Sequence, residues 1–339
     1  MMHIFITALN AVAPILLLVL LGHILRRKNF LTENFLSIGN KLVFRVLLPC
    51  MLFVNVYKVD GLGSIRLDIA LYSVGAAVLL FLLGTVAAVL TTKVPQRRGV
   101  LTQSFFRSNC AIVGLPLAAA IGGDEAVATA AVLSAFAIPT FNILAVISLT
   151  VFLPSQEKKG GNIRGILKSI VTNPLIIGVA TGMLALVLRW LQNQLWGETV
   201  FSLQRDCKFL YTALDNLKSA TTPLALLILG GQFEFSAVSS LKKEIAVGTF
   251  GRIIIAPLLG VGLAMALSAI GWMSVGPNEY PGLVALFASP VAVSSAIMTR
   301  EMGSDEQLAV QLVVWTNLIS MLSIFILVCI LMAMGLVVV

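Results

Sequence analysis

Long apolar stretches with few charged residues alternate with short polar segments along the whole chain. An α-helix of about 20 residues crosses the hydrocarbon core of a bilayer, because each residue adds about 1.5 Å along its axis. The pattern predicts ten transmembrane helices, at residues 4–25, 42–57, 69–92, 100–121, 126–153, 169–190, 217–233, 244–270, 280–299 and 307–335.

The composition indicates the same fold class. Hydrophobic residues make up 58% of the 339 positions and charged residues 11%, whereas soluble domains carry about 25% charged residues. The 12 prolines and 27 glycines are dispersed through apolar sequence, which excludes a disordered or low-complexity chain. We therefore expect an all-α integral membrane protein surrounded by the lipid bilayer.

The net charge of +8 does not indicate a nucleic-acid partner, because the basic residues form no continuous basic face. Their distribution reflects the membrane topology instead. Fifteen of the 23 basic residues fall in one set of alternate loops, and six fall in the other set. The positive-inside rule makes the first set cytoplasmic, so both termini are expected outside the cell membrane. Arg26, Arg27 and Lys28 follow the first span, the reverse of a signal peptide, so that span is expected to be retained.

Side chains for metal binding or covalent catalysis are scarce. The four cysteines show no Cys-x-x-Cys spacing, and the chain has two histidines. His-Glu-x-x-His, paired catalytic aspartates and an in-membrane serine with a histidine partner are all missing from the sequence. We therefore expect no metal, no cofactor and no enzyme activity, which disfavours an intramembrane enzyme.

Prolines inside the spans repeat at a fixed distance. Pro49 and Pro116 are 67 residues apart, as are Pro223 and Pro290, and the two pairs share an offset of 174. The pairs lie in predicted spans two and four and in spans seven and nine. Two halves of five spans have opposite orientations because five is an odd number, so the pattern predicts an inverted repeat.

The predicted halves are residues 1–153 and 169–339, joined by a cytoplasmic linker at residues 154–168. Inverted repeats are typical of secondary transporters, whose sites lie near the midplane where broken helices expose their ends. Spans four and nine are the expected broken helices, because each contains proline beside small residues. Kinked but continuous helices are the alternative.

This arrangement resembles the auxin efflux carrier family, which includes plant auxin exporters and bacterial carriers of malate, malonate or related acids. The resemblance covers essentially the whole chain. It rests on the ten-span layout and on Asn109, Gly114-Leu115-Pro116, Ser289-Pro290, Met302-Gly303 and Asp305. The long central loop of plant exporters is absent, so the chain is closer to a short bacterial-type carrier.

The resemblance implies two crossing broken helices, a scaffold domain and a transport domain that moves as an elevator. It also implies that Asn109, Pro116 and Pro290 lie at the crossover where the substrate binds. Gly114 and Ser289 lie beside them and complete this set. The implied function is transport of small organic anions, and formation of a homodimer stays open.

Three polar side chains have two possible roles each. The Asn109 amide both donates and accepts hydrogen bonds, so it suits a substrate carboxylate or a coupling ion, or else the freed backbone at a break. Arg107 and Arg252 lie inside spans, where a buried arginine is costly and indicates function. Long side chains also snorkel to headgroups. We include Arg107 in the substrate site and favour snorkelling for Arg252.

Neutral polar residues in the spans support either an ion or helix packing. The candidates are Ser294, Asn142, Thr316 and Asn317. No carboxylate is expected at mid-membrane, which disfavours a cation exchanger but not a channel. Coupling to sodium, or to a proton that the substrate brings, stays open. Asn55 is assigned to the scaffold side, away from the site.

Overall fold

The computed structural model describes residues 2–58, 67–153, 171–277 and 279–337. All regular structure in these ranges is helical, so the expected all-α class is confirmed for them. The predicted linker at residues 154–168 lies outside the described residues. The helices are α1 (Met2–Arg27), α2 (Glu33–Leu42), η1 (Val43–Leu47), α3 (Leu48–Tyr57), α4 (Leu67–Thr91), α5 (Pro95–Phe106), η2 (Cys110–Gly114), α6 (Leu115–Val151), α8 (Pro174–Trp196), α9 (Leu203–Asp206), α10 (Lys208–Gln232), α11 (Ala237–Phe250), η3 (Gly251–Ile255), η4 (Leu258–Gly262), α12 (Leu263–Ala269), α13 (Glu279–Phe287), α14 (Val293–Glu301) and α15 (Glu306–Ala333).

Six helical segments of the described chain are long and apolar enough to cross a membrane. Three of them join two or more of the elements named above, because π-helical turns (η) continue directly into α-helix. The segment that includes α6 contains a sharp kink where Gly122 and Gly123 leave the helical conformation. Gly123 has a φ of +62°, which residues with a Cβ rarely adopt. The kink lies at the predicted boundary between spans four and five.

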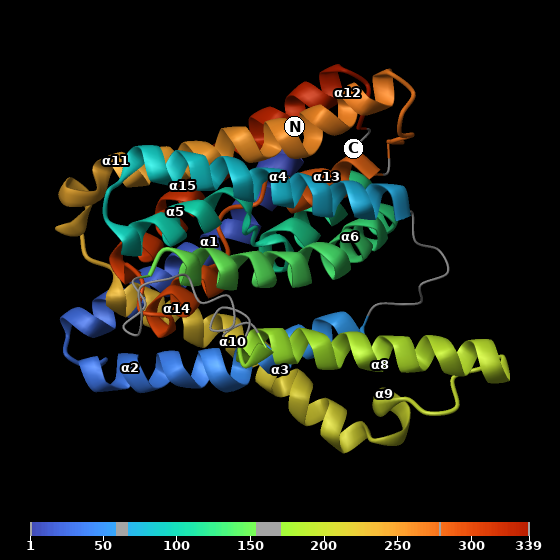
Figure 1. Ribbon diagram of the computed structural model, residues 1–339, viewed down its shortest axis with the longest axis horizontal. Helices are drawn as coiled ribbons and strands as arrows, with labels where there is room; N and C mark the ends of the chain where they lie inside the picture. Colours follow the sequence, from blue (N-terminus) through green and yellow to red (C-terminus); the bar gives the residue numbers. More distant parts are fainter. Residues whose placement is uncertain (1, 59–66, 154–170, 278, 338–339) are drawn as a thin grey trace.

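The helices form two groups, which Figure 1 shows as a lower and an upper set. The lower group consists of α2, η1, α3, α8 and α10, which pack on one another. The upper group consists of α4, α5, η2, α6, α11, η3, α13, α14 and α15, of which α14 borders the lower group and packs on α10 and η1 as well as on α15. Helix α1 lies between them and packs against α10 on one side and against α15 and α6 on the other.

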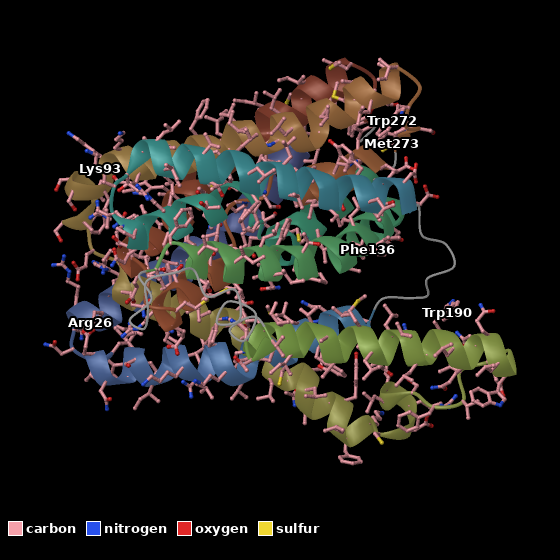
Figure 2. The ribbon with its side chains drawn as sticks, viewed as in Figure 1. Arg26, Lys93, Phe136, Trp190, Trp272 and Met273 are labelled. Atoms are coloured by element: carbon pink, nitrogen blue, oxygen red, sulfur yellow. The ribbon has the colours of Figure 1, made fainter. Side chains whose placement is uncertain are left out.

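The two ends of the molecule differ in their side chains. Arg26 and Lys93 lie at one end in Figure 2, and Trp190 and Trp272 lie at the opposite end. Basic residues and interfacial tryptophans are the usual markers of membrane–water interfaces. The helices therefore run between an end that the charge pattern predicts to be cytoplasmic and an end that it predicts to be outside.

Candidate functional site

Two helices of the upper group are interrupted at the same place. The first interruption follows α5 and the second follows α13. The two extended segments pair in antiparallel fashion: the N–H of Asn109 donates to the carbonyl of Pro290 at 2.9 Å, and the N–H of Ala292 donates to the carbonyl of Arg107 at 3.1 Å. These bonds satisfy backbone groups that have left the helices, which is a requirement away from water.

The first interruption lies earlier than the sequence suggested. The glycine and proline of span four led us to expect it near Gly114–Pro116, but the chain leaves the helix at Arg107 and turns helical again at Cys110. Pro116 instead lies inside the continuous helical segment Cys110–Val151, directly after the π-helical turn η2, and does not interrupt it. Pro290 does lie in the second interruption, between α13 and α14.

Gly114 has a packing role rather than a hinge role. A Cβ built on it would lie 2.3 Å from the carbonyl oxygen of Ala285 on α13, so the bare Cα lets the two crossing elements touch. We expect Gly114→Ala to lower stability by about 1 to 3 kcal/mol, because the neighbour is backbone and must shift. Gly75→Ala on α4 is the matched control, since nothing lies within 4 Å of its added Cβ. Thermal unfolding in detergent measures both, and equal melting temperatures would contradict the packing role.

Arg252 on η3 stabilises the backbone at both interruptions. The side chain is fully buried, and its guanidinium donates to four backbone carbonyls. These are the carbonyls of Ser289 at 2.7 Å, Phe287 at 2.9 Å, Phe105 at 3.1 Å and Leu286 at 3.2 Å. The expectation that Arg252 snorkels to the headgroups is wrong, because the carbonyls at the ends of α5 and α13 give its donors partners inside the protein.

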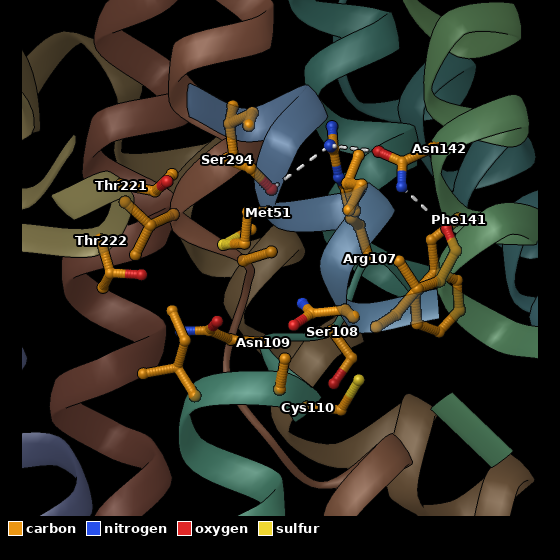
Figure 3. Close-up of a pocket in the computed structure, with 18 of the residues that line it drawn as sticks. Met51, Arg107, Ser108, Asn109, Cys110, Phe141, Asn142, Thr221, Thr222 and Ser294 are labelled. Atoms are coloured by element: carbon orange, nitrogen blue, oxygen red, sulfur yellow. Dashed lines mark hydrogen bonds between the residues drawn. The ribbon is translucent and has the colours of Figure 1, made fainter. Parts of the chain in front are cut away.

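A small cavity of about 60 Å³ lies beside the crossing, between the two helix groups (Figure 3). From the upper group it is lined by residues of both interruptions and of α6. From the lower group it is lined by residues of α3, α8 and α10, among them Asn55, Thr221 and Thr222. The structure thus places Asn55 in the lining, although the sequence reading had set it apart from the site.

Arg107 reaches into this cavity from the first interruption. Its residue is 2% exposed, and Figure 3 shows the guanidinium between Ser294 and Asn142. It donates to Asn142 Oδ1 at 3.0 Å, Met298 Sδ at 3.0 Å, Gln103 Oε1 at 3.2 Å and Ser294 Oγ at 3.3 Å. All four partners are neutral, and no carboxylate of the described chain forms an ion pair with Arg107.

Asn109 contributes a free donor to the same cavity. Its side chain is 5% exposed, and its Nδ2 is buried without a hydrogen-bond partner in the described structure. A buried donor left unsatisfied costs about 1 to 3 kcal/mol. Asn109 lines the small cavity together with the first residues of η2 and of α14. Its amide is therefore placed to donate a hydrogen bond to a ligand in the cavity.

A second, wider cavity of about 400 Å³ continues from the first. Its lining shares Asn55 and Thr222 with the small cavity and adds Lys58 and Lys218. Lys58 forms an ion pair with Asp215 at 3.0 Å, and this carboxylate raises the pKa of Lys58, so the ammonium is charged at neutral pH.

The predicted site residues Ser289, Thr316 and Asn317 do not line the small cavity. Thr316 Oγ1 accepts a hydrogen bond from the N–H of Val291 at 3.1 Å, and Ser289 Oγ donates to the carbonyl of Ala285 at 2.6 Å. Asn317 is fully buried and donates to its own helix. Thr316 and Ser289 therefore hold backbone at the second interruption and its preceding helix.

Sequence reasoning missed part of the site. It named Arg107, Asn109, Asn142 and Ser294, all of which line the small cavity. Among the lining residues of the lower group it named Asn55 alone, and set that residue apart from the site; a further signal was the pair of threonines that precedes Pro223. Two adjacent hydroxyls next to a proline in a predicted span are the kind of polar feature that lines a cavity.

Comparison with known proteins identifies related membrane transport proteins. A family described as "Membrane transport protein" matches residues 7–328. A relative from Methanothermobacter thermautotrophicus, named as an uncharacterized transporter, is 24% identical over 327 residues. That alignment covers 94% of this chain and 97% of the relative. Both matches therefore include the two interruptions and the helices that line the cavity.

Proposed function

Because the chain belongs to the auxin efflux carrier family of membrane transport proteins, we propose that it is a secondary transporter of small organic anions. The substrates are carboxylates such as malate, malonate or auxin-like acids. The observation that carries the proposal is Arg107, a buried guanidinium at a cavity whose neighbours are all neutral. Burying an arginine without a counter-charge is costly, and a carboxylate in the cavity supplies that charge.

The backbone supports the same ligand class. The cavity lining includes Cys110 and Ala111 at the start of η2 and Val293 and Ser294 at the start of α14. The first N–H groups of a helix have no partner within the helix, and they carry about half a positive charge together. The two helix starts and Arg107 thus favour an anion and disfavour a cation, which argues against a cation exchanger. The coupling ion, if there is one, stays open between sodium and a proton.

The position of the cavity between the two helix groups supports a mechanism of alternating access. We propose that the upper group moves against the lower group as an elevator, since each group supplies one wall of the cavity. We also propose that the halves are inverted repeats. The hydroxyl of Thr221 donates to the carbonyl of Leu47 at 3.2 Å, and these two positions are 174 residues apart, the offset of the proline pairs. Contact between equivalent positions is what a two-fold axis between them would produce.

Binding to the purified protein tests the substrate class. We expect malonate, malate or indole-3-acetate to raise the melting temperature, while equal concentrations of choline and of neutral glycerol do not. A ligand at 100 times its Kd adds about 2.7 kcal/mol of stability. Uptake of the stabilising acid into proteoliposomes should saturate and show counterflow, which separates a carrier from a channel. Stabilisation by cations alone would contradict the proposal.

Asn109→Ala is expected to weaken carboxylate binding about ten- to a hundredfold, because a hydrogen bond to a charged ligand is worth about 1.5 to 3 kcal/mol. Folding should be unaffected, since the amide Nδ2 has no protein partner to lose. Thr102→Val on α5 is the matched control, because Thr102 is also buried with an unpartnered hydroxyl but does not line the cavity. Isothermal titration with the stabilising acid gives the two Kd values. Equal values would remove Asn109 from the site.

A further inference from the structure

Arg107 does not line the wider cavity. The position and the charge of this cavity indicate a role of its own. Six residues line both cavities, so the two spaces are continuous. On α10, Lys218 lies one turn before Thr222, a residue of both linings, in the direction of the helix start. On α3, Lys58 follows the shared residue Asn55 by three positions. Both lysines therefore lie away from the crossing, toward the predicted outer face.

The charges that line the wider cavity are of one sign. Lys58 and Lys218 belong to its lining, and none of the described residues that line it is acidic. Asp215 nearby neutralises Lys58 through the ion pair at 3.0 Å. In the part of the chain that the structure describes, no carboxylate pairs with Lys218. Asp215 also acts on Lys218 across a longer distance, so the two lysines and this one aspartate leave a net positive charge, among the described residues, on the path from the predicted outer face to Arg107.

We propose that the wider cavity is the outer vestibule of the carrier and that Lys218 forms a peripheral subsite in it for carboxylate anions. The identity of the anion as a transported substrate rests on the proposed function, whereas the attraction of anions does not. A cleft with charges of one sign and low-dielectric walls concentrates ions of the opposite sign. A carboxylate would first meet Lys218 and then pass to Arg107 in the small cavity.

The apolar part of the wall fits such a transient site. Next to the lysines the vestibule is lined by Met51, Val56, Leu115 and Ile138, which offer an anion no hydrogen bonds. Lys218 acts as a flexible point charge that attracts a carboxylate without a fixed geometry. We therefore expect Lys218 to affect access from one side of the membrane and to have little effect on binding at the crossing.

Reaction rates of a cysteine in the vestibule measure this attraction without any transport. Ser219 lines the wider cavity and is exposed, so Ser219→Cys is made in a chain whose four native cysteines are replaced. The membrane-impermeant reagents 2-sulfonatoethyl and 2-(trimethylammonium)ethyl methanethiosulfonate differ in charge. The ratio of their rates, divided by the ratio for free 2-mercaptoethanol, reports the local potential.

Lys218→Met is expected to lower this anionic-to-cationic rate ratio by about three- to tenfold, as removal of one charge at close range should. Lys208→Met is the matched control, because Lys208 lies on the same helix, is exposed and is outside the cavity lining. It should change the ratio less than twofold. Asp215→Asn should raise the anionic-to-cationic rate ratio, because it removes the negative charge that is paired with Lys58. An unchanged ratio in Lys218→Met would overturn the proposal.

Transport then separates the subsite from the proposed function. In proteoliposomes, Lys218→Met should raise the half-saturating concentration of malonate about three- to tenfold from the side that carries Lys218, and less than twofold from the other side. Equal changes on both sides would contradict a vestibule role. If the labelling ratio falls as expected but no carboxylate is transported, the subsite is supported and the proposed function fails.

Discussion

Replacing Arg107 with glutamine is expected to abolish carboxylate binding while leaving the protein as stable as before, or more stable. Removing one member of a buried charge pair typically costs about 2 to 5 kcal/mol of binding, which is at least about thirtyfold in Kd. Without ligand, the substitution is expected to leave the stability unchanged or to raise it, because burying an unpaired cation costs folding free energy. Glutamine also keeps a polar group within the set of neutral partners around Arg107.

The measurement is a pair of titrations. Melting temperatures of the wild type and of Arg107→Gln are compared in the absence and in the presence of the stabilising carboxylate. We expect the ligand-dependent rise to vanish in the variant while the ligand-free value is unchanged or higher. Arg107→Lys keeps the charge without the planar fork, so it should retain part of the rise. A ligand-free melting temperature that drops sharply in Arg107→Gln would make Arg107 a structural residue.

Replacing Arg252 with methionine should have the opposite outcome and lower the stability of the fold by about 3 to 5 kcal/mol. Four buried carbonyls would lose their donor at once, and each unsatisfied group costs about 1 to 3 kcal/mol, although such costs do not simply add. Arg252→Lys should rescue little of this, because one ammonium cannot span carbonyls of both α5 and α13 as the guanidinium does.

Arg45→Met provides the matched control for Arg252. Arg45 lies in η1 within a predicted span but is exposed, so its loss should change the melting temperature little. Purified protein in detergent is heated, and loss of monodisperse protein is followed by size-exclusion chromatography. An Arg252→Met variant as stable as Arg45→Met would show that the crossing does not depend on the guanidinium.

The sequence predicted the all-helical class, which is confirmed for the described residues, whereas the ten-span layout stays a prediction, because six helical segments of the described chain are long and apolar enough to span a membrane. Apolar runs locate the helices because membrane helices must be apolar over their full length. Pro290 correctly marks an interruption, since proline removes a helical donor. Pro116 does not, because the chain stays helical around it, from the π-helical turn η2 into α6. Whether a proline marks an interruption depends on the partners of the backbone, and here the first interruption is set by pairing with residues more than 180 positions away.

The same limit applies to the site. Arg107 and Arg252 look alike in the sequence, as single basic residues in apolar spans. Their roles differ because α5 and α13 end around Arg252 and offer it carbonyls, whereas Arg107 finds side chains only. Asn55 was likewise misplaced, since the face that a residue presents to another helix group depends on packing between groups. These relations are long-range and leave no local pattern.

The lack of an acidic partner for Arg107 also has an electrical consequence. Under the proposed elevator movement, the paired interruptions carry the guanidiniums of Arg107 and Arg252, neither of which has an acidic partner among the described residues, so these two side chains move two positive charges along the membrane normal in the empty carrier. A monovalent carboxylate bound at Arg107 compensates one of these charges, and a divalent one compensates both. A charge that crosses the full membrane potential gains or loses about 2.3 kcal/mol per 100 mV. Voltage would therefore act most strongly on the return of the empty carrier, less on the step loaded with a monovalent acid, and least on the step loaded with a divalent acid.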